Sequence, residues 1–91
     1  MAFILTRIDV GDYEAWKPMF DLDAPGARES AVGYRLLRSV DRPGEVFVQV
    51  EFASVDDARV GRERLLASGV LDRFADRSDP TVVEQVETFT R

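Results

Sequence analysis

The stretch from Tyr34 to Phe52 constrains the fold of this chain more than any other. Residues 34–40 (YRLLRSV) and 45–52 (EVFVQVEF) are rich in β-branched and aromatic residues, which favour strands. Residues 41–44 (DRPG) between them form a typical turn sequence. Strand pattern, turn chemistry and strand pattern follow one another without a gap, and we therefore predict a β-hairpin.

The register of this hairpin follows from its apolar pattern, because a slip of one residue would turn every side chain to the other face. We expect Val40 to lie opposite Val46, which places Arg35 opposite Glu51 on a mixed face. The other face needs helices to cover it, because nearly all of its side chains are apolar. That face carries Tyr34, Leu36, Arg38, Val48, Val50 and Phe52.

The mixed face of the hairpin carries two large apolar side chains beside its charges. Leu37 and Phe47 are too apolar to be left in free solvent. A second copy of the sheet, packed on this face, would account for both residues.

The segment before the hairpin has the pattern of a strand followed by a helix. Asp12 suits the N-cap of the helix, and Glu14 in the first turn is favoured by the helix dipole. Pro18 and Pro25 each remove an amide donor, so the helix is not expected to be straight. The expected elements are a strand over 3–10, a helix over 13–24, a shorter helical piece over 26–32 and a C-cap at Gly33.

The segment after the hairpin has the pattern of a second helix and a final strand. Ser54 with Asp57 three residues later forms a capping-box sequence, and Gly69 is a good helix terminator. Gly61 inside this helix is unfavourable by about 1 kcal/mol relative to alanine. The expected elements are a helix from 54 to 69, a short extra helix over 70–77 and a strand over 81–89.

The order of these elements is strand, helix, strand, strand, helix, strand. Right-handed crossovers close it into a four-stranded antiparallel sheet with both helices on one face. We therefore predict an α+β, ferredoxin-like βαββαβ fold as one domain over residues 1–91. RNA-recognition domains share this order, but their stacking residues are mostly missing here and the net charge of -5 has the wrong sign.

The composition excludes several classes of site. The chain has no cysteine and no histidine, which removes thiolate chemistry, the usual general base and the usual metal and haem ligands. The acidic balance disfavours nucleic acid and anionic membranes as partners. The apolar start of the chain is interrupted by Arg7, too early for a signal peptide or a membrane span. We expect a cytoplasmic protein that binds no metal.

Three stretches carry a resemblance to known proteins, namely residues 12–21 (DYEAWKPMFD), 34–46 (YRLLRSVDRPGEV) and 50–52 (VEF). On these residues the chain resembles the dimeric α+β barrel superfamily, in particular small antibiotic-biosynthesis-monooxygenase-like or cyclase-like proteins. The resemblance implies a homodimer joined through the open sheet faces, with a pocket between sheet and helices in each protomer. Related proteins often carry a histidine where this chain has Asp23, so histidine-dependent chemistry and haem are not expected here, nor is any other cofactor.

Asp23 and Arg38 are the candidate catalytic residues. Asp23 falls between Phe20 and Ala27 on the apolar stripe of the first helix, and a carboxylate among apolar groups takes up a proton more readily. Alternatively, the kink at Pro25 turns it to solvent or makes it a local cap. Arg38 could bind an oxyanion or pair with Asp23, or else its head could simply reach water.

The candidate substrate-binding residues are aromatic or very small. Trp16, Phe20 and Tyr34 could line an aromatic pocket, although such residues more often form core. Gly61 could leave room for a ligand, although close packing of the helix on the sheet would explain it equally well.

Two functions from different classes follow. The first is a cofactor-free enzyme, a monooxygenase or an isomerase or cyclase, acting on a small apolar or aromatic, oxygenated metabolite. In it Asp23 moves a proton, Arg38 stabilises the developing oxyanion, and the aromatic residues hold the ring. The second is a non-catalytic homodimer, either a carrier of small apolar ligands or a stress-related accessory protein. A pocket in which Asp23 and Arg38 converge would favour the enzyme.

Overall fold

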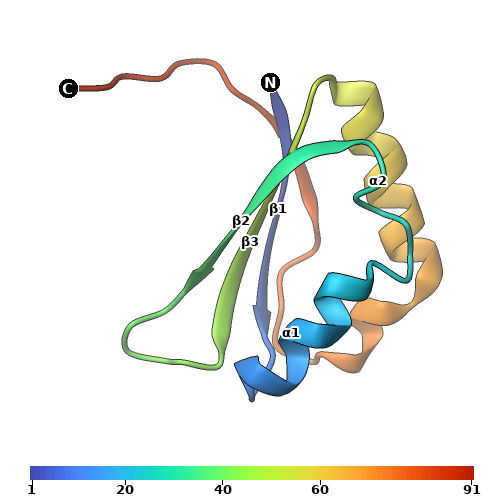
Figure 1. Cartoon of the computed structure of the whole chain (residues 1–91), viewed down its shortest axis with the longest axis vertical. Helices are drawn as coiled ribbons and strands as arrows, with labels where there is room; N and C mark the ends of the chain where they lie inside the picture. The colour runs from blue at the N-terminus through green and yellow to red at the C-terminus, as the bar shows by residue number, and fades with distance from the viewer.

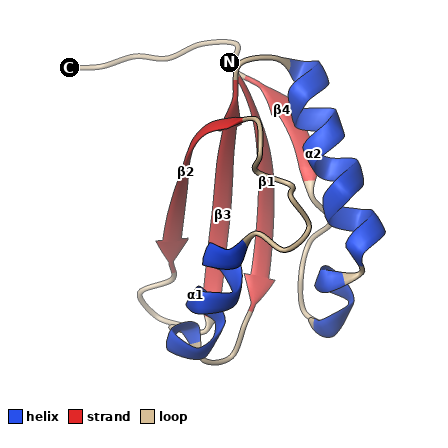
Figure 2. Cartoon of the chain, turned by 45° about the vertical axis from the view of Figure 1, so that its right-hand side comes forward, coloured by secondary structure: helices blue, strands red, loops and turns tan.

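The computed structural model describes residues 1–91 and has the predicted ferredoxin-like fold. The sheet order is β2-β3-β1-β4, all neighbours run antiparallel, and both helices cover the same face (Figures 1 and 2). Neither helix is long and apolar enough to cross a membrane. The elements are β1 (Ala2–Asp9), α1 (Tyr13–Leu22), β2 (Ala31–Arg38), β3 (Glu45–Phe52), α2 (Val55–Ser68), the 3-10 helix η1 (Val70–Arg73) and β4 (Thr81–Glu84).

The core lies between the sheet and the two helices. Alternate residues of β1 and β3 point toward the helices, and this alternation gives each strand one buried face. Trp16 of α1, Ala58 of α2 and Leu71 of η1 close the core from the helical side. The buried strand residues are Ala2, Ile4, Thr6, Ile8, Val46, Val48, Val50 and Phe52.

Helix α1 begins where the sequence predicts and ends earlier. The Asp12 carboxylate caps it by accepting hydrogen bonds from the amides of Glu14 (3.0 Å) and Ala15 (3.4 Å). The helix stops at Leu22 because Asp23 adopts the left-handed conformation, with φ of 45°. Pro25 and the left-handed Gly26 follow, and both oppose a new helix.

The helical piece expected over 26–32 is therefore wrong, as is the C-cap at Gly33. Residues 27–30 form turns, and β2 begins at Ala31, which pairs with Phe52. Gly33 pairs with Glu51, so the strand has a bulge at Val32. Pairing with β3 overrides the helical pattern in this segment.

Helix α2 agrees with the prediction at both ends. Ser54 Oγ accepts a hydrogen bond from the Asp57 amide at 3.1 Å, and Gly69 ends the helix with φ of 72°. Gly61 lies where α2 packs tightly against its neighbours. A Cβ atom there would lie 2.6 Å from the carbonyl oxygen of Ala27 and 3.0 Å from the Phe52 ring.

The hairpin is present, but the predicted register is wrong by two residues. Val46 pairs with Arg38 instead of Val40, and Arg35 lies opposite Gln49 instead of Glu51. The loop is longer than a four-residue turn, since residues 39–44 all lie outside the strands. A slip of two residues keeps every side chain on its predicted face, so the two faces are as expected.

The loop of the hairpin is closed by its own hydrogen bonds. Ser39 Oγ accepts from the Arg42 amide at 3.1 Å, and the Glu45 amide donates to the Arg42 carbonyl at 2.8 Å. Val40 therefore lies outside the paired residues of the hairpin and is 94% exposed.

The C-terminal elements are shorter than predicted. The extra helix expected over 70–77 is a single 3-10 turn that ends at Arg73. β4 ends at Glu84 instead of Phe89, because Glu84 pairs with Ala2, the first residue of β1, and only one more backbone bond follows, from the Gln85 amide to the Met1 carbonyl at 3.0 Å. The residues after Gln85 run away from the body of the protein (Figure 1), with Val86 and Phe89 exposed.

A network of five charged residues joins β1, the hairpin loop and the segment before β4. Arg7 contacts Glu45 at 3.1 Å and Asp76 at 2.6 Å. Arg42 contacts Asp9 at 3.3 Å, Glu45 at 3.5 Å and Asp76 at 3.6 Å. The hydrogen bond and the charge of Arg7 hold the pKa of the Asp76 carboxyl below its ordinary value of 3.8.

This lowered pKa predicts how stability depends on pH. The ionised Asp76 stabilises the folded state above pH 3.8, and the contribution is lost as pH falls through the lower pKa of the folded state. Asp76→Asn is expected to be less stable than wild type at pH 6, with a difference that shrinks below pH 4. The urea unfolding midpoints of both proteins at pH 6 and pH 3 measure this difference in stability. A difference that stays constant over this range would contradict the role given to Arg7.

Candidate functional site

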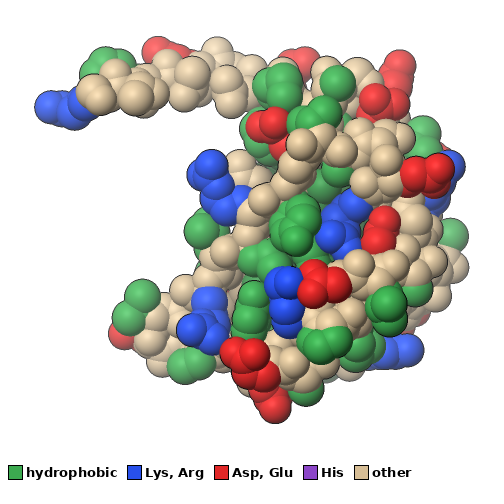
Figure 3. All heavy atoms as spheres, viewed as in Figure 1, with side chains coloured by type: hydrophobic (Ala, Val, Ile, Leu, Met, Phe, Trp, Pro, Cys, Tyr) green, Lys and Arg blue, Asp and Glu red, His purple; other side chains and the backbone are tan.

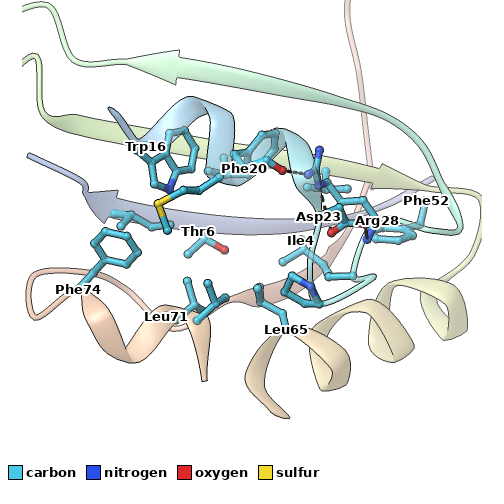
Figure 4. A pocket seen from close by; sticks show the side chains of 17 residues that line it. Ile4, Thr6, Trp16, Phe20, Asp23, Arg28, Phe52, Leu65, Leu71 and Phe74 are labelled. Atoms are coloured by element: carbon cyan, nitrogen blue, oxygen red, sulfur yellow. Dashed lines mark hydrogen bonds and ion pairs between the residues drawn. The ribbon is translucent and has the colours of Figure 1, made fainter. Parts of the chain in front are cut away.

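A cavity of about 100 Å³ lies between the sheet and the helices (Figure 4). Hydrocarbon side chains from β1, β3, both helices and η1 form most of its wall. The polar exceptions are Thr6, Trp16, Asp23 and Arg28. The remaining lining residues are Ile4, Ile8, Met19, Phe20, Pro25, Ala27, Val48, Val50, Phe52, Leu65, Val70, Leu71 and Phe74.

Two polar groups point into this cavity without a partner in the chain. Thr6 comes from the middle of β1 and Trp16 from α1, and they are 6% and 7% exposed. Figure 4 shows the Thr6 hydroxyl and the Trp16 indole nitrogen on the cavity side of their residues. Neither group forms a hydrogen bond within the chain, and no polar atom is fully enclosed without a partner, so both are open to the cavity.

Asp23 and Arg28 form a charged pair at one end of the cavity. The Asp23 carboxylate accepts a hydrogen bond from the Arg28 amide at 3.0 Å and lies 3.6 Å from the Arg28 Nε. The Arg28 guanidinium also donates to the Phe20 carbonyl oxygen and lies 3.7 Å from the centre of the Phe20 ring. Both side chains are mostly buried. These contacts fix the arginine and leave the carboxylate at the cavity wall.

A row of aromatic rings leads from the cavity to the surface. Trp16 lies 5.9 Å from Tyr13 and 5.1 Å from Phe20, measured between ring centres. Phe20 in turn meets the edge of Tyr34 at 5.1 Å. Aromatic pairs at these separations stabilise one another beyond their burial alone. Phe20 and Trp16 are therefore held in place as the wall of the cavity.

The structure brings together only some of the predicted site residues. Asp23, Trp16 and Phe20 line the cavity, whereas Arg38, Tyr34 and Gly61 do not. Arg38 is exposed and its guanidinium lies 5.2 Å from the Tyr13 ring. Tyr34 is 49% exposed, outside Phe20. The space beside Gly61 is filled by Ala27 and Phe52. This glycine therefore allows the helix to pack closely and does not leave room for a ligand.

Two residues of the site were missed by the sequence analysis. Arg28 belongs to a segment that was predicted as helix, and its partnership with Asp23 depends on the turn after α1. Thr6 did carry a signal, because it is a polar residue between Ile4 and Ile8 on one face of a predicted strand. No group of acidic residues gathers where it could hold a metal ion.

Comparison with solved structures shows which proteins share this fold. A protein from Nitrosomonas europaea, provisionally described as an antibiotic biosynthesis monooxygenase, superposes with a TM-score of 0.67 at 18% identity, covering 96% of this chain and all of that one. One from Deinococcus radiodurans with the same description gives 0.62 at 14% identity, over 100% and 98% of the two chains. Rv0793 from Mycobacterium tuberculosis gives 0.68 at 15% identity, over 98% of each.

These similarities establish the class of the fold over its whole length. The chain has the ferredoxin-like α+β fold that these proteins share, as the sequence predicted. No family model matches the sequence, and no curated protein matches it.

Proposed function

We propose that the protein binds a small apolar or aromatic, oxygen-bearing molecule in the cavity between the sheet and the helices. The lining carries this proposal, because hydrocarbon surrounds two polar groups that have no partner in the chain. Ligand sites are commonly apolar cavities with a few polar groups that orient the ligand. An apolar cavity of about 150 Å³ can hold benzene, so about 100 Å³ suits a single ring after slight expansion.

The reaction we propose is a cofactor-free monooxygenation of a phenol-like compound. Asp23 takes the phenolic proton, and the electron-rich ring carbon then reacts with dioxygen. One oxygen atom enters the ring and the other leaves as water with the two substrate hydrogens, so phenol and dioxygen give a quinone and water. Arg28, and not Arg38, is the arginine that pairs with Asp23 and orients its carboxylate. Isomerisation or cyclisation could begin with the same proton transfer.

The single tryptophan makes the proposal directly testable. Because Trp16 is the only tryptophan and lines the cavity, its fluorescence reports whether a ligand is bound. Phenols, naphthols and small lactones are titrated in turn, and each ligand that binds is then tested in an oxygen electrode. Saturable quenching with oxygen uptake supports the enzyme. The absence of quenching by any of these compounds would overturn the proposal.

The second candidate function is a non-catalytic ligand-binding homodimer, such as a carrier or a stress-related accessory protein. The Asp23 carboxylate already contacts both the amide and the side chain of Arg28, and Arg38 lies outside the cavity. Both observations favour binding over proton transfer. Quenching by a ligand that is never consumed would support this function against the enzyme.

We also propose that the open face of the sheet associates with a second copy of the chain. No helix covers this face (Figure 2), yet Leu5, Leu37 and Phe47 lie on it with exposed fractions of 40%, 48% and 41%. Leu37 and Phe47 are direct neighbours across β2 and β3, so they form one continuous apolar surface. An identical sheet would cover these residues with residues of the same kind.

Phe47→Glu is expected to convert the dimer into a monomer, because it would bury a carboxylate in the proposed contact. Light scattering during size-exclusion chromatography measures the mass. Val40→Glu, in the exposed hairpin loop, adds the same charge away from the sheet and should leave the mass unchanged. A wild-type protein that is monomeric at high concentration would contradict the proposed association.

A further inference from the structure

The buried face of β1 contains one residue that does not match its surroundings. Thr6 is the only polar residue among the buried residues of the strands, and it lies between Ile4 and Ile8 and opposite Val48. Valine would fill the same space without a polar atom. Buried polar groups in folded proteins nearly always have a hydrogen-bond partner. The Thr6 hydroxyl has none in the chain and is open to the cavity, so a ligand in the cavity can supply one.

The indole of Trp16 supplies a second group of the same kind. Its ring is fixed between Tyr13 and Phe20, so the direction of the indole N–H is fixed as well. Figure 4 shows this nitrogen turned toward the side of the cavity that also holds the Thr6 hydroxyl. An indole N–H can only donate, whereas a hydroxyl can donate or accept. A hydroxyl or carbonyl oxygen of a ligand therefore has the chemistry to bond with either group.

The charge and size of the cavity restrict the ligand further. The only cation on its wall is Arg28, and this charge is already paired with Asp23. A carboxylate or phosphate would therefore enter an apolar cavity without a free counter-charge, which is strongly unfavourable. The volume of about 100 Å³ suits one ring after slight expansion and is too small for two.

We propose that the ligand is a neutral, single-ring compound with one hydroxyl or carbonyl oxygen, and that this oxygen is held by Thr6 Oγ1 and Trp16 Nε1. Thr6 and Trp16 are then the residues that determine specificity. This inference rests on the proposed function, because it concerns the same cavity. It adds the charge and size of the ligand and the atoms that recognise it.

The experiment compares phenol with toluene, which differ by one hydroxyl group. Phenol loses more hydration free energy than toluene when it leaves water, so its absolute affinity combines this cost with the hydrogen bonds formed in the cavity. The cost is the same for every variant. The informative quantity is therefore how the ratio of the phenol and toluene affinities changes between variants. Thr6→Val keeps the shape of the side chain and removes the hydroxyl. It is expected to lower the phenol-to-toluene ratio about 10-fold, which corresponds to about one hydrogen bond. Calorimetry on the full chain measures both dissociation constants.

Thr6→Ser is the matched control, because it keeps the hydroxyl and should retain most of the wild-type ratio. The melting temperature of Thr6→Val should be at or above that of wild type, since the change removes a buried polar group without a partner. Trp16→Phe gives a second test, because it removes the N–H donor while keeping an aromatic ring in the wall, and the toluene affinity accounts for the space that the smaller ring opens. It should also lower the ratio without loss of toluene binding. Benzoate should bind more weakly than phenol.

The outcomes separate this inference from the function on which it rests. If the phenol-to-toluene ratio is the same in wild type, Thr6→Val and Trp16→Phe, recognition by these two groups is wrong and ligand binding in the cavity still stands. If benzoate binds more tightly than phenol, the neutral charge of the ligand is wrong. If neither phenol nor toluene binds, and no larger compound quenches Trp16, the proposed function fails and this inference fails with it.

Discussion

Replacing Asp23 with asparagine is expected to lower the rate of oxygen uptake at least 100-fold with any phenol that the protein consumes. Loss of a positioned general base typically lowers the rate by about 10²- to 10⁴-fold. Asparagine keeps the size of the side chain and tolerates the left-handed backbone at this position. Its carbonyl oxygen can still accept the hydrogen bond from the Arg28 amide. The fold and the ligand affinity should therefore change little.

The measurement is the steady-state rate in an oxygen electrode, together with the Trp16 fluorescence titration. Asp21→Asn is the matched control, because it makes the same chemical change two residues earlier, where the carboxylate pairs with Lys17 on the exposed side of α1. This control should keep the wild-type rate. An Asp23→Asn variant with full turnover would exclude proton transfer by Asp23.

Gly61→Ala is expected to destabilise the protein by about 2 kcal/mol, although alanine is the better helix former. The gain in helix propensity is about 1 kcal/mol. The added Cβ would lie 2.6 Å from the Ala27 carbonyl oxygen, a main-chain atom that can move only if the segment before β2 moves. Overpacking a core costs about 1 to 3 kcal/mol, and a main-chain clash lies at the upper end of that range. The packing cost therefore exceeds the gain in propensity.

Gly33→Ala provides the matched control for this substitution. It adds the same methyl group in β2, where nothing lies within 4 Å of the added atom, so stability should change little. Urea unfolding of both variants measures the difference in free energy. A Gly61→Ala variant that is as stable as wild type would show that α2 can move away from Ala27 at little cost.

The strands and α2 could be predicted from the sequence because their signals are local. The alternation in β3, the Ser54 cap and the Gly69 terminator each act within a few residues of where they stand. The end of β4 could not be predicted in this way. Its sequence remains typical of a strand up to Phe89, but the number of residues that pair is set by β1, which lies about 80 positions away in the chain.

The candidate site was only partly predictable for a related reason. Periodicity placed Asp23 on the apolar side of α1, and the residue does line the cavity, although the helix ends before it. Arg38 points to the predicted face of the sheet, but it stands at the far end of β2 and is exposed to solvent there. Arg28 could not be predicted, because its position depends on a turn that brings together residues five apart without any periodic pattern.

Because β1 lies in the middle of the sheet, the sheet can be completed only near the end of synthesis. β1 pairs with β3 on one edge and β4 on the other, and both partners are translated later. Until residue 84 has left the ribosome, one edge of an apolar strand stays open to pairing with other chains. A stall or a premature stop before Thr81 would therefore release a product with an exposed central strand, which should aggregate instead of persisting as a shortened but folded protein.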